Sequence, residues 1–301
     1  MLTSRRRRTR SARASSSVLA TRVLAVGLAA CAIASCSSSG KTGTASTTTT
    51  SVVASTTSTT SPPSFGATTF ASQQQLPGGY QQGVARVPGG WIFSATDSLW
   101  RTDDHLNVLK HISPAIPAAW KAKGFNHVGD VDVVGKYIYA PFEQPDYSKG
   151  QQATARYDRV TLQFVDAVMV PQHENSFVTI DPNTMIAYTM NHFDGGALLR
   201  YDVANRWKLL PPLRMSKVLH RTQGGDVALG QIWISTDDPI HGVYHVDLRT
   251  GATSLVAQMG HAGGEGEGID ATQLPSGLLH VMCVDPKYAP VWFEHIRIAI
   301  S

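Results

Sequence analysis

The sequence predicts an all-β protein built as a five-bladed β-propeller, and three observations support this fold class. The first is that one pattern of short strands recurs five times at a spacing of 46 to 49 residues. A strand repeat of this length is typical of one propeller blade. The second strand of every copy opens with a hydrophobic triplet, and these triplets begin at Trp91, Tyr137, Ile186, Ile232 and Leu279.

The second observation is a basic residue that stands two positions before an aspartate in the third strand of four copies. In the hairpin that follows, we expect this aspartate to accept backbone N–H bonds and to hold the turn. These aspartates are Asp103, Asp158, Asp202 and Asp247. The first strands of the five blades are expected around Val84, Val131, Val178, Val227 and Ile269.

The third observation is that the fifth repeat lacks a fourth strand, since only the expected third strand at 292–300 follows its second. The segment Thr68–Ala71 precedes the first repeat and has no partner of its own. A propeller protects its edges when an N-terminal strand completes the last blade. We therefore expect residues near 67–73 to close the ring. A six-bladed ring is the alternative, but the segment 64–83 is short for a sixth blade.

Residues 1–35 have the features of an export signal. They contain seven arginines and no acidic residue, followed by an apolar stretch of roughly 13 residues that ends at Ser35. This stretch is shorter than the roughly 20 residues that a membrane-spanning helix needs. Its last residues, Ile33-Ala34-Ser35-Cys36, resemble the lipobox of bacterial lipoproteins. The resemblance implies cleavage before Cys36 and attachment of a lipid to its sulfur, with Cys31 as the alternative site.

A Ser/Thr-rich segment at 36–65 follows, and its composition predicts a disordered tether between the anchor and a propeller at 66–301. We therefore expect the protein at the outer face of the cell membrane, held there by its lipid. Acyl chains contribute about 0.8 kcal/mol for each buried methylene.

The charge of the chain excludes a nucleic-acid role. The whole sequence has 26 basic and 22 acidic side chains, but seven of the basic ones belong to the export signal. The remaining part has a net charge of −3, so the basic balance does not belong to the folded domain. Beyond residue 36, Cys283 is the single cysteine, and we expect it to be a buried small hydrophobe in a strand.

The candidate site lies where the first strands begin, because these strands line the channel of a propeller. Aligning the blades places Tyr80, His127, Glu174, Gln223 and Glu265 at equivalent positions of one channel mouth. Three assignments follow from this ring of polar residues. The predicted ligand-binding residues are His173, Glu174, Asp226 and Glu265; the predicted metal ligands are Glu267, Asp130 and Glu174; the candidate catalytic residues are Asp130 and His127.

The repeat pattern and the run Glu265-Gly-Glu-Gly-Ile269 resemble secreted bacterial propellers of the SMP-30/gluconolactonase and YncE-like type. The resemblance implies one divalent cation, Ca²⁺, in the channel, and hydrolysis of lactones or esters. Those enzymes have six blades, whereas this sequence predicts five. Olfactomedin domains have five blades and a channel cation, and they bind without catalysis.

Two functions stay open at this point. The first is a monomeric, lipid-anchored protein whose propeller binds an envelope glycan, peptide or protein without catalysis. The alternative is a Ca²⁺-dependent lactonase or esterase with its site at the channel mouth. We favour the first, because no nucleophile–base pair is recognisable in the sequence.

Overall fold

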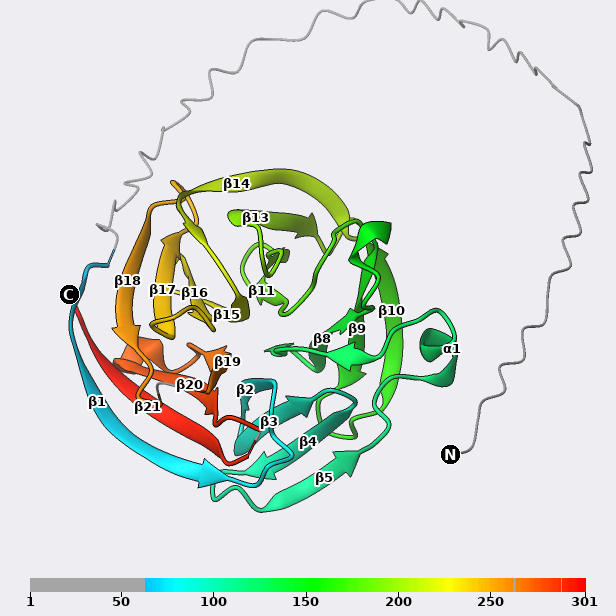
Figure 1. The fold of residues 1–301 in the computed structure, drawn as a ribbon, viewed down its shortest axis with the longest axis horizontal. Helices are drawn as coiled ribbons and strands as arrows, with labels where there is room; N and C mark the ends of the chain where they lie inside the picture. Colours follow the sequence, from blue (N-terminus) through cyan, green and yellow to red (C-terminus); the bar gives the residue numbers. More distant parts are fainter. Residues whose placement is uncertain (1–62, 262–263, 288) are drawn as a thin grey trace, which may run out of the picture. The chain divides into compact units, whose positions relative to one another are not determined.

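The computed structural model describes residues 63–261, 264–287 and 289–301, and these form five antiparallel sheets around one axis (Figure 1). The prediction of a five-bladed propeller is confirmed. The predicted signal peptide, Cys31, Cys36 and nearly all of the tether lie outside the described residues. Among the described residues, no helix is long and apolar enough to cross a membrane.

Each blade runs from an inner strand at the axis to an outer strand at the rim (Figure 1). Blade 1 consists of β2 (Gly83–Val87), β3 (Gly90–Ala95), β4 (Ser98–Asp103) and β5 (Val108–Ile112). Blade 2 consists of β6 (His127–Val128), β7 (Asp132–Val134), β8 (Tyr137–Glu143), β9 (Gln152–Asp158) and β10 (Phe164–Val170). Its inner strand is divided, because β6 and β7 both pair with β8.

The other three blades have four strands each. Blade 3 consists of β11 (Thr179–Asp181), β12 (Ile186–Thr189), β13 (Gly195–Asp202) and β14 (Lys208–Leu219). Blade 4 consists of β15 (Thr222–Ala228), β16 (Gln231–Thr236), β17 (Gly242–Asp247) and β18 (Thr253–Gln258). Blade 5 consists of β19 (Glu265–Asp270), β20 (Leu278–Val284), β21 (Val291–Ile300) and β1 (Phe65–Leu76). The helical segments of the described residues are short: α1 (Ala118–Lys121), η1 (Tyr147–Lys149) and η2 (Leu274–Ser276).

The N-terminal strand β1 closes the ring, as the incomplete fifth repeat predicts. It pairs antiparallel with β21 from Phe65↔Ile300 to Leu76↔Val291, and the backbones of Ser64 and Ser301 exchange two further hydrogen bonds. The strand starts at Phe65, so it includes the last residue that the sequence assigns to the tether. Figure 1 shows β1 lying along β21 at the rim of the propeller.

The hairpin aspartates have the predicted structural role. In blade 1, Oδ1 of Asp103 accepts hydrogen bonds from the backbone N–H groups of His105 and Asn107. Asp158, Asp202 and Asp247 accept equivalent bonds in their own hairpins. These carboxylates fix the turns between third and fourth strands, so they are not available for a ligand.

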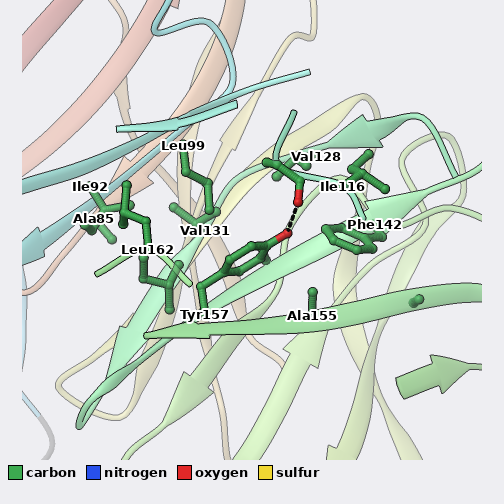
Figure 2. Packing of buried hydrophobic residues seen from close by; sticks show 14 of the residues in the cluster. Ala85, Ile92, Leu99, Ile116, Val128, Val131, Phe142, Ala155, Tyr157 and Leu162 are labelled. Carbon is green, nitrogen blue, oxygen red and sulfur yellow. Dashed lines mark hydrogen bonds between the residues drawn. The ribbon is translucent and has the colours of Figure 1, made fainter. Parts of the chain in front are cut away.

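The hydrophobic core consists of five clusters of described residues, each between two neighbouring blades. Figure 2 shows the cluster between blades 1 and 2, where Tyr157 and Phe142 pack with Ile92 and Leu99. The Tyr157 hydroxyl donates a 2.8 Å hydrogen bond to the carbonyl of Ala115. Cys283 belongs to the cluster between blades 4 and 5 and is fully buried, and this burial raises the pKa of its thiol. It is the small buried hydrophobe that the sequence predicts.

Candidate functional site

The centre of the propeller axis is occupied by the side chain of Asp130, which lies between β6 and β7. Its Oδ1 accepts a 3.0 Å hydrogen bond from the Val84 N–H of blade 1. Its Oδ2 accepts bonds from the Gly225 N–H of blade 4 at 3.1 Å and the Ile269 N–H of blade 5 at 3.3 Å. One buried carboxylate therefore holds four of the five blades together.

Three glycines make room for this carboxylate: Gly83, Gly224 and Gly268, one from each of blades 1, 4 and 5. A Cβ added to any of them would stand 2.7 Å from a carboxylate oxygen of Asp130. A larger residue at these positions would thus collide with the group that connects the blades. Gly268, the second glycine of the run Glu265-Gly-Glu-Gly-Ile269, therefore serves close packing at the axis.

A second layer of side chains links neighbouring blades further along the axis. Asp132 accepts a bond from the Ile180 N–H at 2.7 Å, Asp226 from the Ala271 N–H at 2.6 Å, and Asp270 from the Arg86 N–H at 2.6 Å. In blade 3 the equivalent acceptor is the hydroxyl of Thr179, which binds the Val227 N–H. Burial raises the pKa of Asp132 and of Asp270 to about 6, and it also raises the pKa of Asp226.

The candidate site is a 380 Å³ pocket at the other end of the axis, where the first strands begin. Its lining is acidic, with three glutamates and two histidines, and no lysine or arginine of the described chain belongs to it. The residues that line it are Gln82, Thr96, His127, Glu143, Tyr147, Ser176, His192, Phe193, Gln223, Glu265 and Glu267.

Glu267 is the most deeply buried acid of this mouth pocket, with 1% of its surface exposed. Its Oε1 has no hydrogen-bond partner in the described structure. Burial raises the pKa of Glu267 well above its usual value, and the charge of Glu265 and a side-chain hydrogen bond with Glu265 raise it further. Glu267 thus favours its protonated, uncharged form.

Glu143 lies on the blade-2 side of the pocket. Its Oε1 accepts a 3.0 Å hydrogen bond from the Asn175 N–H, and burial raises the pKa of its carboxyl group. Glu174 lies near Glu143 and does not line the pocket. Its Oε2 accepts a hydrogen bond from the N–H of the lining residue Phe193 at 3.0 Å. Glu174 therefore positions the loop that carries His192 and Phe193.

The two histidines of the pocket are neutral at physiological pH. Burial lowers the pKa of His127 to about 4, and it also lowers the pKa of His192. His127 shares a 2.5 Å hydrogen bond with Gln82, and Nδ1 of His192 bonds the carbonyl of Thr222 at 3.1 Å. Each ring is thus held by one nitrogen, which leaves the other nitrogen for a ligand.

The structure brings three of the predicted site residues together in the pocket: His127, Glu265 and Glu267. It places the others elsewhere. Asp130 lies in the axis with both oxygens bonded to backbone N–H groups, and Asp226 belongs to the inter-blade layer near the opposite end. His173 is exposed and bonds the Tyr147 carbonyl outside the pocket. Tyr80 is buried against Phe93 in the core, and Gln82 takes the expected place at the mouth.

Seven pocket residues were not predicted from the sequence. Gln82 and Ser176 precede inner strands, and the other five are Thr96, Glu143, Tyr147, His192 and Phe193. These five belong to the ends of second strands or to the loops that follow them. A signal for them exists in the strand register, because His127 pairs with Glu143 across β6 and β8. Antiparallel pairing puts the end of each second strand beside the start of the first. The residues directly after a second strand therefore belong to the same mouth.

Oxygen ligands of this kind suit Ca²⁺, and the unpartnered Oε1 of Glu267 fits such an ion. Glu143 and Gln223 supply further oxygens in the same pocket. Within the residues that the structure describes, however, no three His, Cys, Asp or Glu side chains converge with metal-site geometry.

Comparison with known proteins supports the fold and assigns no family. No protein-family model matches the chain, and no curated protein matches it in sequence. The structure of a glutaminyl cyclase from Myxococcus xanthus is similar, with a TM-score of 0.54 and 13% identity, and the match covers 78% of this chain and 97% of that one.

Two further solved structures are similar at lower scores. They are the WD40 domain of Pan2 from Neurospora crassa, at TM-score 0.39 and 9% identity, and a hydrazine synthase from Kuenenia stuttgartiensis, at 0.42 and 13%. The matches cover 71% and 73% of this chain, which spans 62% of each of those chains. The five sheets of the structure define this chain as a β-propeller, and the similarity to the M. xanthus structure agrees with that fold.

Proposed function

We propose that the chain is an exported, lipid-anchored protein whose propeller binds a small ligand through a protonated amine. The observation that carries the proposal is the composition of the mouth pocket, whose lining includes three glutamates and, within the described part of the chain, no lysine or arginine. Buried carboxylates are costly unless a cation or hydrogen-bond donors satisfy them. A ligand that supplies both is an ammonium group, which carries three donors.

The hydrogen bonds of the pocket support this choice. Oε1 of Glu267 has no partner from the protein, so an ammonium donor can bind it without displacing a native contact. His127 and His192 are neutral and thus add no positive charge that would repel the ligand. Gln223 and Ser176 add uncharged polar groups to the same wall.

The rim of the pocket favours a ligand with an apolar portion beside the amine. Phe193 is 59% exposed and Tyr147 is 36% exposed, although both are large side chains. Phe193 lies edge-on against His192, with ring centroids 4.3 Å apart. Exposed aromatic side chains at the rim of a pocket are typical of ligand contact. The N-terminus of a peptide offers this combination, because its protonated amine lies beside the first side chain.

A second candidate function is catalysis, and the carboxyl pair Glu265–Glu267 favours it. Two neighbouring carboxyl groups can act as acid and base in one reaction. The similar M. xanthus structure is named a glutaminyl cyclase. Cyclisation of an N-terminal glutaminyl residue starts from its amine, which is the group that this pocket suits. The amine nitrogen bonds to the side-chain carbonyl carbon, the amide C–N bond breaks, and ammonia leaves. Glu265 would take the proton from the amine, and Glu267, whose raised pKa favours the protonated carboxyl group, would give one to the leaving nitrogen.

The Ca²⁺-dependent lactonase or esterase is the other catalytic alternative. If Ca²⁺ binds, Glu143, Glu265 and Glu267 are the residues that would hold it, and the ion would polarise a carbonyl group. Asp130 does not suit the role of general base there, because its two oxygens accept backbone hydrogen bonds. His127 keeps a free nitrogen and suits it better.

The test is titration calorimetry of the full-length chain with the tripeptide Gln-Ala-Ala and with its N-acetylated form. We expect the free amine to bind at least about tenfold more tightly, because a charged hydrogen bond contributes about 1.5–3 kcal/mol. Glu267→Gln should remove this preference. Equal affinity for both peptides would refute the amine site.

Mass spectrometry of the same mixtures separates binding from catalysis. Loss of ammonia from Gln-Ala-Ala, abolished by Glu267→Gln, identifies a cyclase; binding without loss identifies a binding protein. The Ca²⁺ alternative is checked by thermal unfolding with EDTA and then with CaCl₂. A rise in Tm with Ca²⁺ that Glu267→Gln abolishes would favour the hydrolase instead.

A further inference from the structure

A second pocket lies at the seam where blade 5 meets blade 1, and it shares no residue with the mouth pocket. It has a volume of 380 Å³ and is walled by β1, β20 and β21 together with three residues of blade 1. The aromatic, amide, imidazole and guanidinium side chains that line it are those of Arg86, Trp91, Gln273, His280, His295 and Arg297.

Three of these residues form a hydrogen-bonded chain. His280 on β20 and His295 on β21 are cross-strand partners, and their Nδ1 atoms are 2.7 Å apart. Nε2 of His280 is also 2.7 Å from Oε1 of Gln273. Burial lowers the pKa of His280 to about 3 and also lowers the pKa of His295, so both rings are neutral.

The donor and the acceptor of each hydrogen bond in this series follow from the chemistry of the atoms involved. A carbonyl oxygen only accepts, so Nε2 of His280 donates to Gln273 and its Nδ1 carries the lone pair. Nδ1 of His295 must then donate to His280. Because a neutral imidazole has one donor and one acceptor, the lone pair of His295 is at Nε2. That atom has no hydrogen-bond partner among the described residues.

The pocket also contains two arginines, of which Arg86 is paired with an acid in the described structure and Arg297 is not. Arg86 binds Oδ1 of Asp104 at 2.5 Å and lies 4.6 Å from the centre of the Trp91 ring. Arg297 is exposed, and within the described part of the chain it makes no ion pair. A guanidinium group in this position favours a carboxylate, which it can bind with two parallel hydrogen bonds.

The pocket is built in advance of any ligand. Trp91 is held edge-on by His280 and Phe293, at centroid distances of 4.8 and 5.0 Å. The lone pair at His295 is held in place by Gln273 through His280. A rigid acceptor beside an anion site and an indole wall is a set of groups that a small sugar acid matches.

We propose that this seam pocket binds a small hydroxylated carboxylate of the uronic acid type. Arg297 binds the carboxylate, Nε2 of His295 accepts a hydrogen bond from a ligand hydroxyl, and Trp91 forms the apolar wall. The proposal does not depend on the function of the mouth pocket.

The test is titration calorimetry of the full-length chain with D-glucuronate, D-glucose and acetate as probes. D-glucose has the hydroxyl groups and lacks the carboxylate, whereas acetate has the carboxylate and lacks the hydroxyl groups. We expect saturable binding of one D-glucuronate per chain, at least about tenfold tighter than either comparison probe. No saturable binding, or equal binding of acetate, would overturn the proposal.

Variants then locate the site. Arg297→Gln should weaken glucuronate binding about tenfold, whereas Arg206→Gln, an exposed arginine on the β13–β14 hairpin, should leave it unchanged. His295→Asn keeps a donor near the Nδ1 position and removes the Nε2 acceptor, so it should weaken binding, whereas His295→Gln should retain more of it. Equal losses for Arg297→Gln and Arg206→Gln would show charge attraction without a site. Glu267→Gln should not affect glucuronate binding.

Discussion

The two ends of the propeller axis both carry acidic side chains, but these differ in what satisfies them. Near one end, Asp132, Asp226 and Asp270 each accept a backbone hydrogen bond from the next blade along the ring. At the mouth, Glu267 is as deeply buried as Asp270, and one of its oxygens has no hydrogen-bond partner in the described structure. Burial raises the pKa of Asp132 and Asp270 near one end and that of Glu267 at the mouth. The free hydrogen-bonding capacity, and not the burial, therefore distinguishes a site from a structural link.

Asp130 belongs with the structural acids, and its removal should reduce the stability of the fold more than any other substitution below. Asp130→Ala removes the acceptor of N–H groups from blades 1, 4 and 5 and leaves these groups buried. We expect the free energy of unfolding to fall by about 4 kcal/mol, as measured by urea denaturation. Asp130→Asn keeps one acceptor oxygen and should lose less. A stable Asp130→Ala variant would contradict the structural role.

The pH dependence of stability should reveal the inter-blade layer. The pKa of Asp270 is about 6 in the folded chain and about 3.9 in an unfolded one, so the folded state binds the proton more tightly. Its contribution to stability is full below pH ~4 and is lost as the pH rises through ~6.

The variant Asp270→Asn has no such titration. Relative to the native chain, it should therefore gain about 2 kcal/mol between pH 4 and pH 7. Because the histidines titrate equally in both proteins, their effect cancels in the difference. A difference that does not change with pH would show that the Asp270 proton affinity is the same in the folded and unfolded states.

At the mouth, replacing the buried acid should have the opposite effect on stability to Asp130→Ala. Glu267→Gln replaces a buried acid by a neutral group of the same shape and removes the repulsion from Glu265. We expect the free energy of unfolding at pH 7 to rise by about 1 kcal/mol while amine binding is lost. A stability loss as large as that of Asp130→Ala would instead place Glu267 among the structural acids.

The smallest effect is expected at the rim. Phe193 is largely exposed, so Phe193→Ala should leave Tm unchanged. It should weaken binding of Gln-Ala-Ala about fivefold, because one aromatic contact contributes about 0.5–1.5 kcal/mol. Phe70→Ala is the matched control, since Phe70 is 55% exposed on β1 at the rim of the ring. Equal effects of the two changes would exclude Phe193 from the site.

The fold was predictable because its signals are local and repeated. Hydrophobic triplets and hairpin aspartates are properties of single blades, and their period gives the blade number. Closure by β1 was predictable for the same reason, since the fifth repeat lacks one strand. The site was predictable in part: His127, Glu265 and Glu267 begin inner strands, whereas His192 and Phe193 follow a second strand and needed the strand register.

The sequence by itself thus determined five blades, the strand that closes them, and an acidic lining at the mouth of the channel. Only the tertiary structure decided which acids are free. Asp130 bonds N–H groups that are 46 to 139 residues away, and Oε1 of Glu267 bonds none. The physical reason is that a carboxylate is satisfied by donors that approach it in space, and the blades that supply these donors come together when the ring closes.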